Sequence, residues 1–298
     1  MTEDGTQAAT DEPFLEKLLS HRLRGYDNHE QSRAALERMS KARAAYYEID
    51  TRVSRDGGIF IRHNPTFVDG AGTVHTINKL TSAEIAQFDG TDRELPTLDV
   101  ALACFKRQAT ARQRLCIDIK DAGFERAHLA AVRAHGLEEQ VVFLARAPQV
   151  LLALEAEGAR SAMVLSCLLL TALGPAGKRI AGFLSGRVLK HRQTVVIGEG
   201  RFDAPLGDLA IGYQHTLIAG ALPPRLADLL ARSGGGVAVS RFLVGRRLTD
   251  ACHKAGLKVW AYAAHTPGDF ETLAAMPGVD VVFSEDAPAV LAGPIVQL

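Results

Sequence analysis

The chain has 298 residues and carries 34 basic and 34 acidic side chains, so its formal net charge at neutral pH is zero. This balance, without any long run of Lys and Arg, argues against a nucleic-acid partner. Hydrophobic residues make up 47% and charged residues 23% of the chain, as is typical of a globular protein. The length suits one large α/β domain or two small ones, and a chain this long needs no disulfide or metal to stabilise its core.

The N-terminal half is predicted to alternate short apolar strands with helices. Residues 1–12 are polar and acidic, and we expect a disordered tail there rather than a secretory signal. Residues 64–96 are rich in turn signals and predict a small insertion. Hydrophobic periodicity predicts strands over residues 15–20, 46–53, 59–61, 115–119, 141–144 and 162–165, and helices over residues 28–43, 96–108, 124–135 and 147–157.

The C-terminal half begins with residues 167–215, which we predict to be irregular, with a glycine-punctuated apolar helix and one strand near residues 194–197. After this segment the alternation of strands and helices returns. It predicts strands over residues 216–218, 237–240, 257–263 and 279–283, and helices over residues 224–232, 246–254 and 267–275 and after residue 288.

The alternation predicts a parallel sheet with helical crossovers. About eight strand–helix units in roughly 250 residues match a (β/α)8 TIM barrel better than an open sheet. We therefore expect a single barrel domain over residues 13–298, with the small insertion at residues 64–96 after the second strand. In such a barrel, the side chains that act on a substrate lie where the strands end, at the C-terminal face.

The location of the protein follows from two further observations. The longest apolar stretch is too short and too interrupted to span a bilayer. The four cysteines have neither metal-finger nor redox spacing, and we expect buried thiols. They are Cys104, Cys116, Cys167 and Cys252. We therefore expect a cytoplasmic protein without membrane insertion.

Two neighbouring strands carry acidic side chains that share a face. Glu48 and Asp50 are two positions apart on the second strand, so both point to the same side, opposite the apolar residues of that strand. Asp118 lies on the third strand, and Lys120 follows it at the same spacing. A hard divalent cation bound through oxygen would compensate the buried carboxylates, and Lys120 could face an anionic substrate. The alternative is a solvated polar face with salt bridges, which two adjacent strands with the same pattern make less favourable.

His21 and His63 lie at strand ends that flank these carboxylates. One imidazole can take a proton from an attacking hydroxyl while the other protonates the leaving alkoxide, because both titrate near neutral pH. Arg22 would neutralise negative charge that develops on phosphoryl oxygens. A lone histidine at a strand end is more often structural, so the assignment depends on the pair and on the carboxylates between its members.

In this order, the motifs resemble the glycerophosphodiester phosphodiesterase family. The matching segments are His21-Arg22, Asn28-His29-Glu30-Gln31, Glu48-Ile49-Asp50, Arg55-Asp56-Gly57, His63-Asn64, Leu95-Pro96-Thr97-Leu98, Ile117-Asp118-Ile119-Lys120, residues 255–260, residues 278–280 and Ser284-Glu285-Asp286. The chain departs from the family pattern at three of these motifs. Leu23 stands where the family has Gly, Gln31 where it has Asn, and Asp118 where it has Glu.

The resemblance implies a (β/α)8 phosphodiesterase that holds one divalent cation, Mg²⁺ or Ca²⁺, at Glu48, Asp50 and Asp118. His21 and His63 would form the acid/base pair, with Arg22 beside them. The residues expected to bind the substrate are Lys120, Trp260 and Glu30.

The expected substrate is a small-molecule phosphodiester that carries a hydroxyl next to the phosphate. Attack by that hydroxyl would give a cyclic phosphate, which water then opens. Glycerophosphodiesters and sugar phosphodiesters both satisfy this requirement, and the latter include agrocinopine-type opines. Two other hypotheses stay open, namely a sphingomyelinase D-like phospholipid lyase that releases the cyclic product and a non-catalytic barrel that binds a phosphorylated ligand. The sequence does not predict the oligomeric state.

Overall fold

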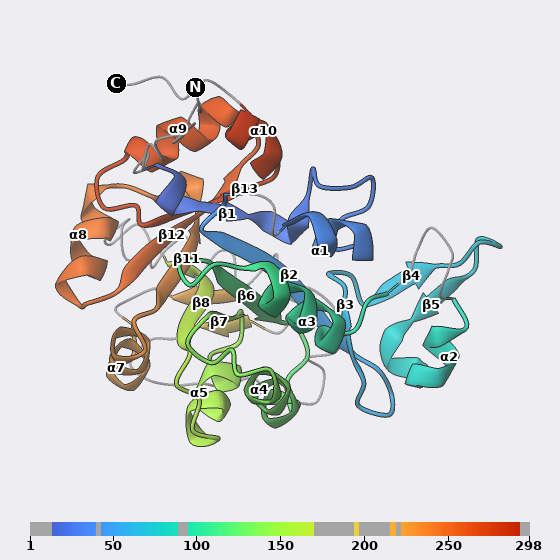
Figure 1. Ribbon diagram of the computed structural model, residues 1–298. Coiled ribbons are helices and arrows are strands. Elements are labelled where there is room, and N and C mark those ends of the chain that lie inside the picture. Colours follow the sequence, from blue (N-terminus) through green and yellow to red (C-terminus); the bar gives the residue numbers. More distant parts are fainter. Residues whose placement is uncertain are drawn as a thin grey trace, which may run out of the picture.

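Eight parallel strands form a closed barrel within the part of the chain that the structure describes (Figure 1). This computed structural model describes residues 14–39, 43–88, 95–169, 194–196, 215–218 and 222–292. Around the barrel, the strands are β1 (Leu18–Ser20), β2 (Tyr46–Val53), β6 (Arg114–Ile119), β7 (Val141–Ala145), β8 (Ala162–Leu169), β11 (Gly236–Ser240), β12 (Lys258–Ala264) and β13 (Val281–Ser284). The ring closes because β1 pairs with both β2 and β13 and because β8 pairs with β11. The predicted (β/α)8 barrel is confirmed.

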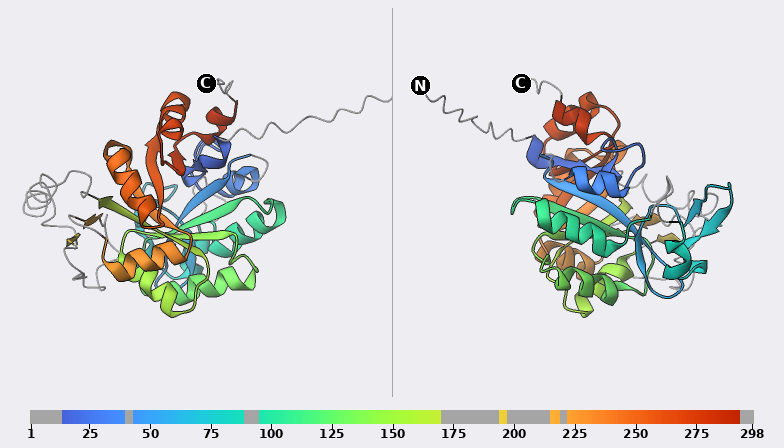
Figure 2. Two further views of the ribbon diagram at one scale, coloured as in Figure 1. Left: turned by 90° about the vertical axis from the view of Figure 1, so that its left-hand side faces the viewer. Right: turned by 45° about the vertical axis from the view of Figure 1, so that its right-hand side comes forward.

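Helices between the strands, and one after the last strand, cover the outside of the barrel (Figure 2). They are α1 (Arg33–Met39), α3 (Leu98–Gln108), α4 (Glu125–Ala134), α5 (Pro148–Ala156), α7 (Pro224–Arg232), α8 (Arg246–Lys254), α9 (Pro267–Ala275) and α10 (Ala287–Ala292). Local sequence fixes several of their starts. Thr97 caps α3 with its side chain, and Thr266 forms a capping box with Asp269 at α9. Within the described ranges, no helix has the length and apolar character that crossing a bilayer requires.

The predicted insertion projects from the barrel after the second strand (Figure 1). Strand β3 (Ile59–Ile61) pairs antiparallel with the end of β2, as the hairpin pattern predicted. A second hairpin of β4 (Thr66–Val68) and β5 (Val74–Thr76) follows, with a 3-10 turn η3 (Ile77–Lys79) and helix α2 (Ser82–Ala86). These elements bury a small cluster of their own, which contains Phe60, Phe67, Ile77, Ile85 and Leu95. The division of the chain into domains stays a prediction.

Helix α1 is shorter than the helix predicted over residues 28–43. It begins at Arg33, because Gln31 has a left-handed φ of 59° that no helix tolerates. The Gln31 side chain gains two buried hydrogen bonds in return, since its amide donates to Asp50 Oδ2 over 2.7 Å and its carbonyl accepts from the Asp50 N–H over 2.9 Å. Residues 40–42, at the other end of the predicted helix, lie outside the described residues, as does the tail at residues 1–12.

Strand β8 is longer than predicted and runs into the segment that was expected to be irregular. Residues 164–166 pair with β11, and residues 167–169 pair with a further strand, β10 (His215–Ile218). The strand predicted over residues 216–218 therefore lies beside β8 and outside the closed ring, with β9 (Thr194–Val196) as its other neighbour. A glycine-punctuated helix was predicted within residues 167–215, of which residues 170–193 lie outside the described residues.

The inside of the barrel changes from apolar to polar along each strand. An inner cluster fills the part of the barrel that is further from its C-terminal face. It contains Leu19, Cys116, Val142, Leu144, Val164, Ala238, Trp260, Val281 and Phe283. Because inward-pointing positions repeat every two residues, the next inward residue on each strand lies one layer nearer the C-terminal face. That next layer contains the polar residues His21, Asp118, Arg146, Ser166, Tyr262 and Glu285. The site is therefore built on a packed apolar floor.

Candidate active site

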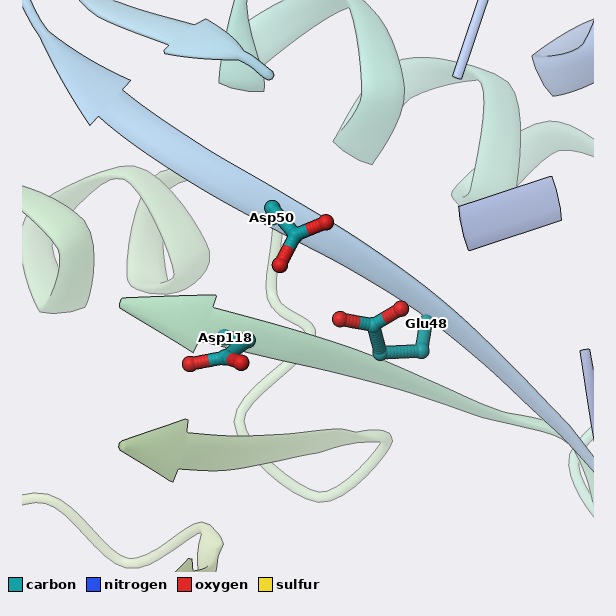
Figure 3. Close-up of side chains that lie close together, drawn as sticks. All are labelled: Glu48, Asp50 and Asp118. Atoms are coloured by element: carbon teal, nitrogen blue, oxygen red, sulfur yellow. The ribbon is translucent and has the colours of Figure 1, made fainter. Parts of the chain in front are cut away.

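Three carboxylates from two neighbouring strands meet inside the barrel (Figure 3). Glu48 and Asp50 lie on β2, and Asp118 lies on β6, where it stands opposite Asp50 in the strand register. All three residues are buried. One oxygen atom from each of them lies within 4.8 Å of the others. The structure thus brings together the three carboxylates that the i, i+2 spacing placed on one face.

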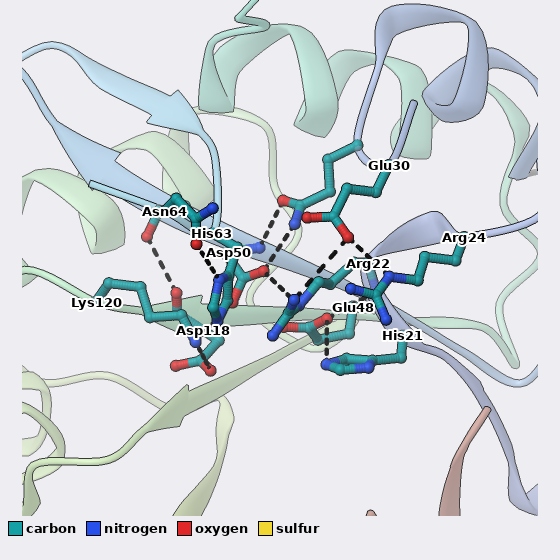
Figure 4. A network of polar contacts seen from close by, with 12 residues as sticks. His21, Arg22, Arg24, Glu30, Glu48, Asp50, His63, Asn64, Asp118 and Lys120 are labelled. Carbon is teal, nitrogen blue, oxygen red and sulfur yellow. Dashed lines mark hydrogen bonds and ion pairs between the residues drawn. The ribbon is translucent and has the colours of Figure 1, made fainter. Parts of the chain in front are cut away.

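Lys120 and Arg22 supply positive charge beside these carboxylates (Figure 4). The Lys120 Nζ lies 2.6 Å from Asp50 Oδ1 and forms a second ion pair with Asp118. The Arg22 Nε lies 3.3 Å from Asp50 Oδ2, and the Arg22 backbone N–H donates to Glu48 Oε2 over 2.9 Å. Buried carboxylates of like charge need such partners, because water is not there to solvate them.

The surroundings shift the pKa values of the two β2 carboxyl groups in opposite directions. Burial, followed by the charge of Asp50, raises the pKa of Glu48 well above its ordinary value. Burial also acts to raise the pKa of Asp50, but Lys120, His63 and Arg22 outweigh it and hold that pKa below its usual range. Asp50 therefore stays ionised, while Glu48 is the carboxyl group of the pair that accepts a proton more readily.

His21 follows β1 and points into the site from the short 3-10 turn η2 (His21–Leu23). Its Nδ1 lies 2.7 Å from Glu285 Oε1, and its Nε2 lies 3.9 Å from Glu48 Oε2. Burial, and then the charge of Arg22, lowers the pKa of His21 to about 3. In this turn Leu23 has a φ of 53°, at the position where the resembling family has Gly. The buried Leu23 side chain packs into the core, which helps to offset the strain of that conformation.

His63 follows β3 and reaches the same carboxylates from their other side (Figure 4). Its Nδ1 lies 2.9 Å from the side-chain oxygen of Asn64. Burial lowers the pKa of His63 to about 4, although the charge of Asp50 opposes this shift. The His63 carbonyl oxygen accepts two hydrogen bonds from the buried Arg52 guanidinium, which forms an ion pair with Asp121 over 2.8 Å. These contacts of Arg52 fix the backbone position of His63.

Two of the residues expected to bind substrate are not among the described residues that line the site, although Glu30 forms an ion pair with Arg22 over 3.9 Å. Trp260 is 2% exposed and packs against Tyr46 and Phe283 in the inner cluster, one layer below the site. Tyr262, two positions further along β12, lines a cavity that opens beside the carboxylates. Glu30 is half-buried and accepts a hydrogen bond from Arg24 Nε over 2.7 Å, and it is not among the described residues that line the cavity. Lys120, the third expected binding residue, does line it.

A cavity of about 200 Å³ opens beside the carboxylates at the C-terminal ends of the strands. Its described lining consists of His21, Arg22, Glu48, Asp118, Lys120, Leu144, Arg146, Ser166, Tyr262, Ala263, Phe283 and Glu285. The sequence analysis gave no role to Arg146, Ser166, Tyr262 or Glu285. The signal that could have found them is the i, i+2 spacing, since each follows an inward apolar residue by two positions at the end of a strand.

The donor set fits a hard divalent cation. Such ions prefer carboxylate oxygens, and three of these come from rigid barrel strands at this site. The Asp118 Oδ1 atom is buried without a hydrogen-bond partner among the described residues, as expected of an oxygen reserved for a ligand. Even with Lys120 and Arg22 nearby, burial and the charge of Asp50 hold the pKa of Glu48 well above its ordinary value, so further positive charge would stabilise the ionised Glu48 carboxylate.

Comparisons with known proteins support the same fold. No family model and no curated protein matches the chain. Among solved structures, a protein from Silicibacter pomeroyi assigned as a glycerophosphoryl diester phosphodiesterase has 16% identity and a TM-score of 0.64, with 92% of this chain and 91% of that chain covered. A glycerophosphodiester phosphodiesterase from Agrobacterium tumefaciens has 16% identity and a TM-score of 0.60, with coverages of 93% and 99%.

A third solved structure has a ligand. It is a phosphodiesterase from Oleispira antarctica in complex with the product sn-glycerol-3-phosphate, and it has 17% identity and a TM-score of 0.60, with 93% of this chain and 96% of that chain covered. The resemblance found in the sequence motifs is thus confirmed at the level of the barrel fold.

Proposed function

We propose that this chain is a metal-dependent phosphodiesterase that hydrolyses a glycerophosphodiester or a sugar phosphodiester. The observation that carries the proposal is the convergence of Glu48, Asp50 and Asp118 with two histidines at the open end of one barrel. The fold likeness to glycerophosphodiester phosphodiesterases supports it. A divalent cation held by the three carboxylates would polarise a phosphoryl oxygen of the substrate.

The two histidines suit different steps because a different charged group acts most strongly on each imidazole ring. Glu285 Oε1 can only accept a hydrogen bond, so the neutral His21 ring carries its proton on Nδ1 and leaves Nε2 free to accept one. Burial, and after it the charge of Arg22, disfavours a second proton on His21. Asp50 favours a second proton on both rings, but it is the strongest charge acting on His63, whose pKa of about 4 is the higher of the two. We therefore assign His21 as the general base and His63 as the general acid.

The reaction follows from this assignment. His21 Nε2 takes the proton of the substrate hydroxyl next to the phosphate, and that oxygen forms a bond to phosphorus. The bond from phosphorus to the leaving oxygen breaks, and His63 gives its proton to that oxygen. Lys120 and Arg22 face the negative phosphoryl oxygens. Water then opens the cyclic phosphate, with the two histidines in exchanged roles.

A screen of purified protein against glycerophosphoethanolamine and agrocinopine-type sugar phosphodiesters, with and without EDTA, tests this proposal. We expect turnover that EDTA removes and Mg²⁺ or Ca²⁺ restores. Each of His21→Ala and His63→Ala should lose about 10²–10⁴-fold in kcat. His265→Ala, at an exposed histidine that is not among the described lining residues, is the matched control and should keep wild-type turnover.

Near-wild-type rates in both site variants would refute the acid/base assignment, and no turnover of any diester would refute the function. Phosphorus NMR of the products decides between hydrolysis and the sphingomyelinase D-like reaction, because only a lyase lets the cyclic phosphate accumulate.

A further inference from the structure

The cavity has two chemically different halves. The carboxylates that line it, together with His21, Arg22 and Lys120, come from one continuous arc of strands, β13, β1, β2 and β6. The remaining polar lining residues come from the other side of the ring. They are Arg146 after β7, Ser166 on β8 and Tyr262 on β12. Among the described lining residues, no carboxylate belongs to this second arc.

The polar groups of the second arc act on one another. Burial has the largest effect on the pKa of the Tyr262 phenol, and the Ser166 hydroxyl and the positive charge of Arg146 both act to lower it. Burial raises the pKa of Tyr262 to about 12, so its hydroxyl stays protonated and can donate a hydrogen bond. All three residues are half-buried. This half of the cavity therefore offers one guanidinium and two hydroxyl groups in a partly desolvated setting.

We infer that Arg146, Ser166 and Tyr262 form a subsite for a second negative charge on the alcohol that the enzyme releases. The inference rests on the proposed function, in which the first arc holds the phosphodiester and its acid and base. The second arc lines the same cavity, so a group attached to that phosphodiester can reach it. A guanidinium binds carboxylate or phosphate with two parallel hydrogen bonds and repels a choline-like cation. The preferred substrate class is thus a phosphodiester whose leaving alcohol carries its own carboxylate or phosphate group.

Two matched pairs of substrates test this subsite. Glycerophosphoserine and glycerophosphoethanolamine differ by one carboxylate, and glycerophosphoinositol 4-phosphate and glycerophosphoinositol differ by one phosphate group. In the wild type we expect a higher kcat/KM for the anionic member of at least one pair, and the pair that responds identifies the anion. In Arg146→Gln that ratio should fall about tenfold or more, the loss expected of one charge-assisted hydrogen bond, and mainly through KM.

Three further variants complete the test. Arg146→Lys keeps the charge and should restore much of the ratio. Tyr262→Phe should reduce it less than Arg146→Gln does, and it provides a second measurement if Arg146→Gln fails to fold. Arg225→Gln removes an exposed arginine on α7, away from the cavity lining, and should leave the ratio unchanged. Ratios within threefold of wild type in both Arg146→Gln and Tyr262→Phe would overturn the inference.

The failure of this inference differs from the failure of the proposed function. If the wild type cleaves the diesters but the ratios do not depend on Arg146, only the subsite is wrong. If it cleaves none of them, the proposed function is wrong, and Kd values for the same four diesters, measured by calorimetry, then test the subsite alone. A binding preference for the anionic member that Arg146→Gln abolishes would support it, and equal Kd values within each pair would overturn it.

Discussion

Glu285 is the residue whose substitution tests the proposed catalytic geometry most directly. It links the end of β13 to the turn that follows β1, because Oε1 lies 2.7 Å from His21 Nδ1 and Oε2 forms an ion pair with Arg24. In Glu285→Gln, the Arg24 guanidinium can only donate, so the new amide should turn its oxygen to Arg24 and its N–H₂ group to His21. His21 would then accept at Nδ1 and carry its proton on Nε2, where it cannot act as a base.

The size of the effect follows from the hydrogen bond that is lost. A hydrogen bond to a charged group contributes about 1.5–3 kcal/mol, and each 1.4 kcal/mol corresponds to a factor of ten in rate. We therefore expect kcat to fall roughly 10- to 150-fold in Glu285→Gln. KM should change little, because this bond orients a base and does not hold the substrate.

Steady-state kinetics on the best substrate from the screen, with ¹⁵N NMR of the His21 ring to report its tautomer, measures both parts of the prediction. Asp286→Asn is the matched control, since it removes a neighbouring carboxylate that caps α10 through the Ala289 N–H. A kcat within threefold of wild type in Glu285→Gln, or an equal loss in Asp286→Asn, would show that Glu285 does not set the state of His21.

Three further outcomes can be measured. Glu48→Gln should weaken Mg²⁺ and Ca²⁺ binding at least about tenfold by calorimetry, since even outer partners of metal ligands have effects of that size. Asp121→Asn leaves the buried Arg52 without its counter-charge and should lower the free energy of urea unfolding by about 3–5 kcal/mol, whereas Asp99→Asn, at an exposed pair, should change it little. Burial lowers the pKa of His128 from 6.5 to about 4. As the pH falls, His128 therefore takes up a proton in the unfolded chain before it does so in the folded chain. Unfolding free energy should therefore fall by up to about 3 kcal/mol as pH drops from 6.5 to 4, and His128→Gln should lose this component.

The barrel and its carboxylate site could be predicted from sequence because both follow from local periodicity. An i, i+2 spacing fixes which side chains share the inner face of a strand, and neighbouring strands of a parallel barrel place their ends together. Glu48, Asp50 and Asp118 obey these two rules, and the structure brings them within reach of one cation. Helices α7, α8 and α9 have the bounds that the sequence predicted, and in α7 and α9 a Pro at the first turn marks the start.

The remaining features depend on contacts between segments that are distant in the sequence. Gln31 shortens α1 because its side chain bonds Asp50 across the site, and no local propensity reports such a contact. The length of β8 depends on its pairing with β10, which lies outside the barrel ring. Roles assigned to single residues stay predictions until they are measured, including those of His21 and His63.

Trp260 and Tyr262 show that the layer in which a side chain lies inside the barrel determines whether it can contact a substrate. Both side chains share the inner face of β12, yet Trp260 belongs to the apolar floor and Tyr262 lines the cavity. The family motif draws attention to the large aromatic residue, whereas strand register determines which of the two meets solvent. Leu144 and Phe283 belong to the same apolar cluster but also line the cavity, and Arg146 and Glu285 follow them by two positions. Substrate preference should therefore change with substitutions in the upper layer, while substitutions in the lower layer should change mainly the stability of the barrel on which the site stands.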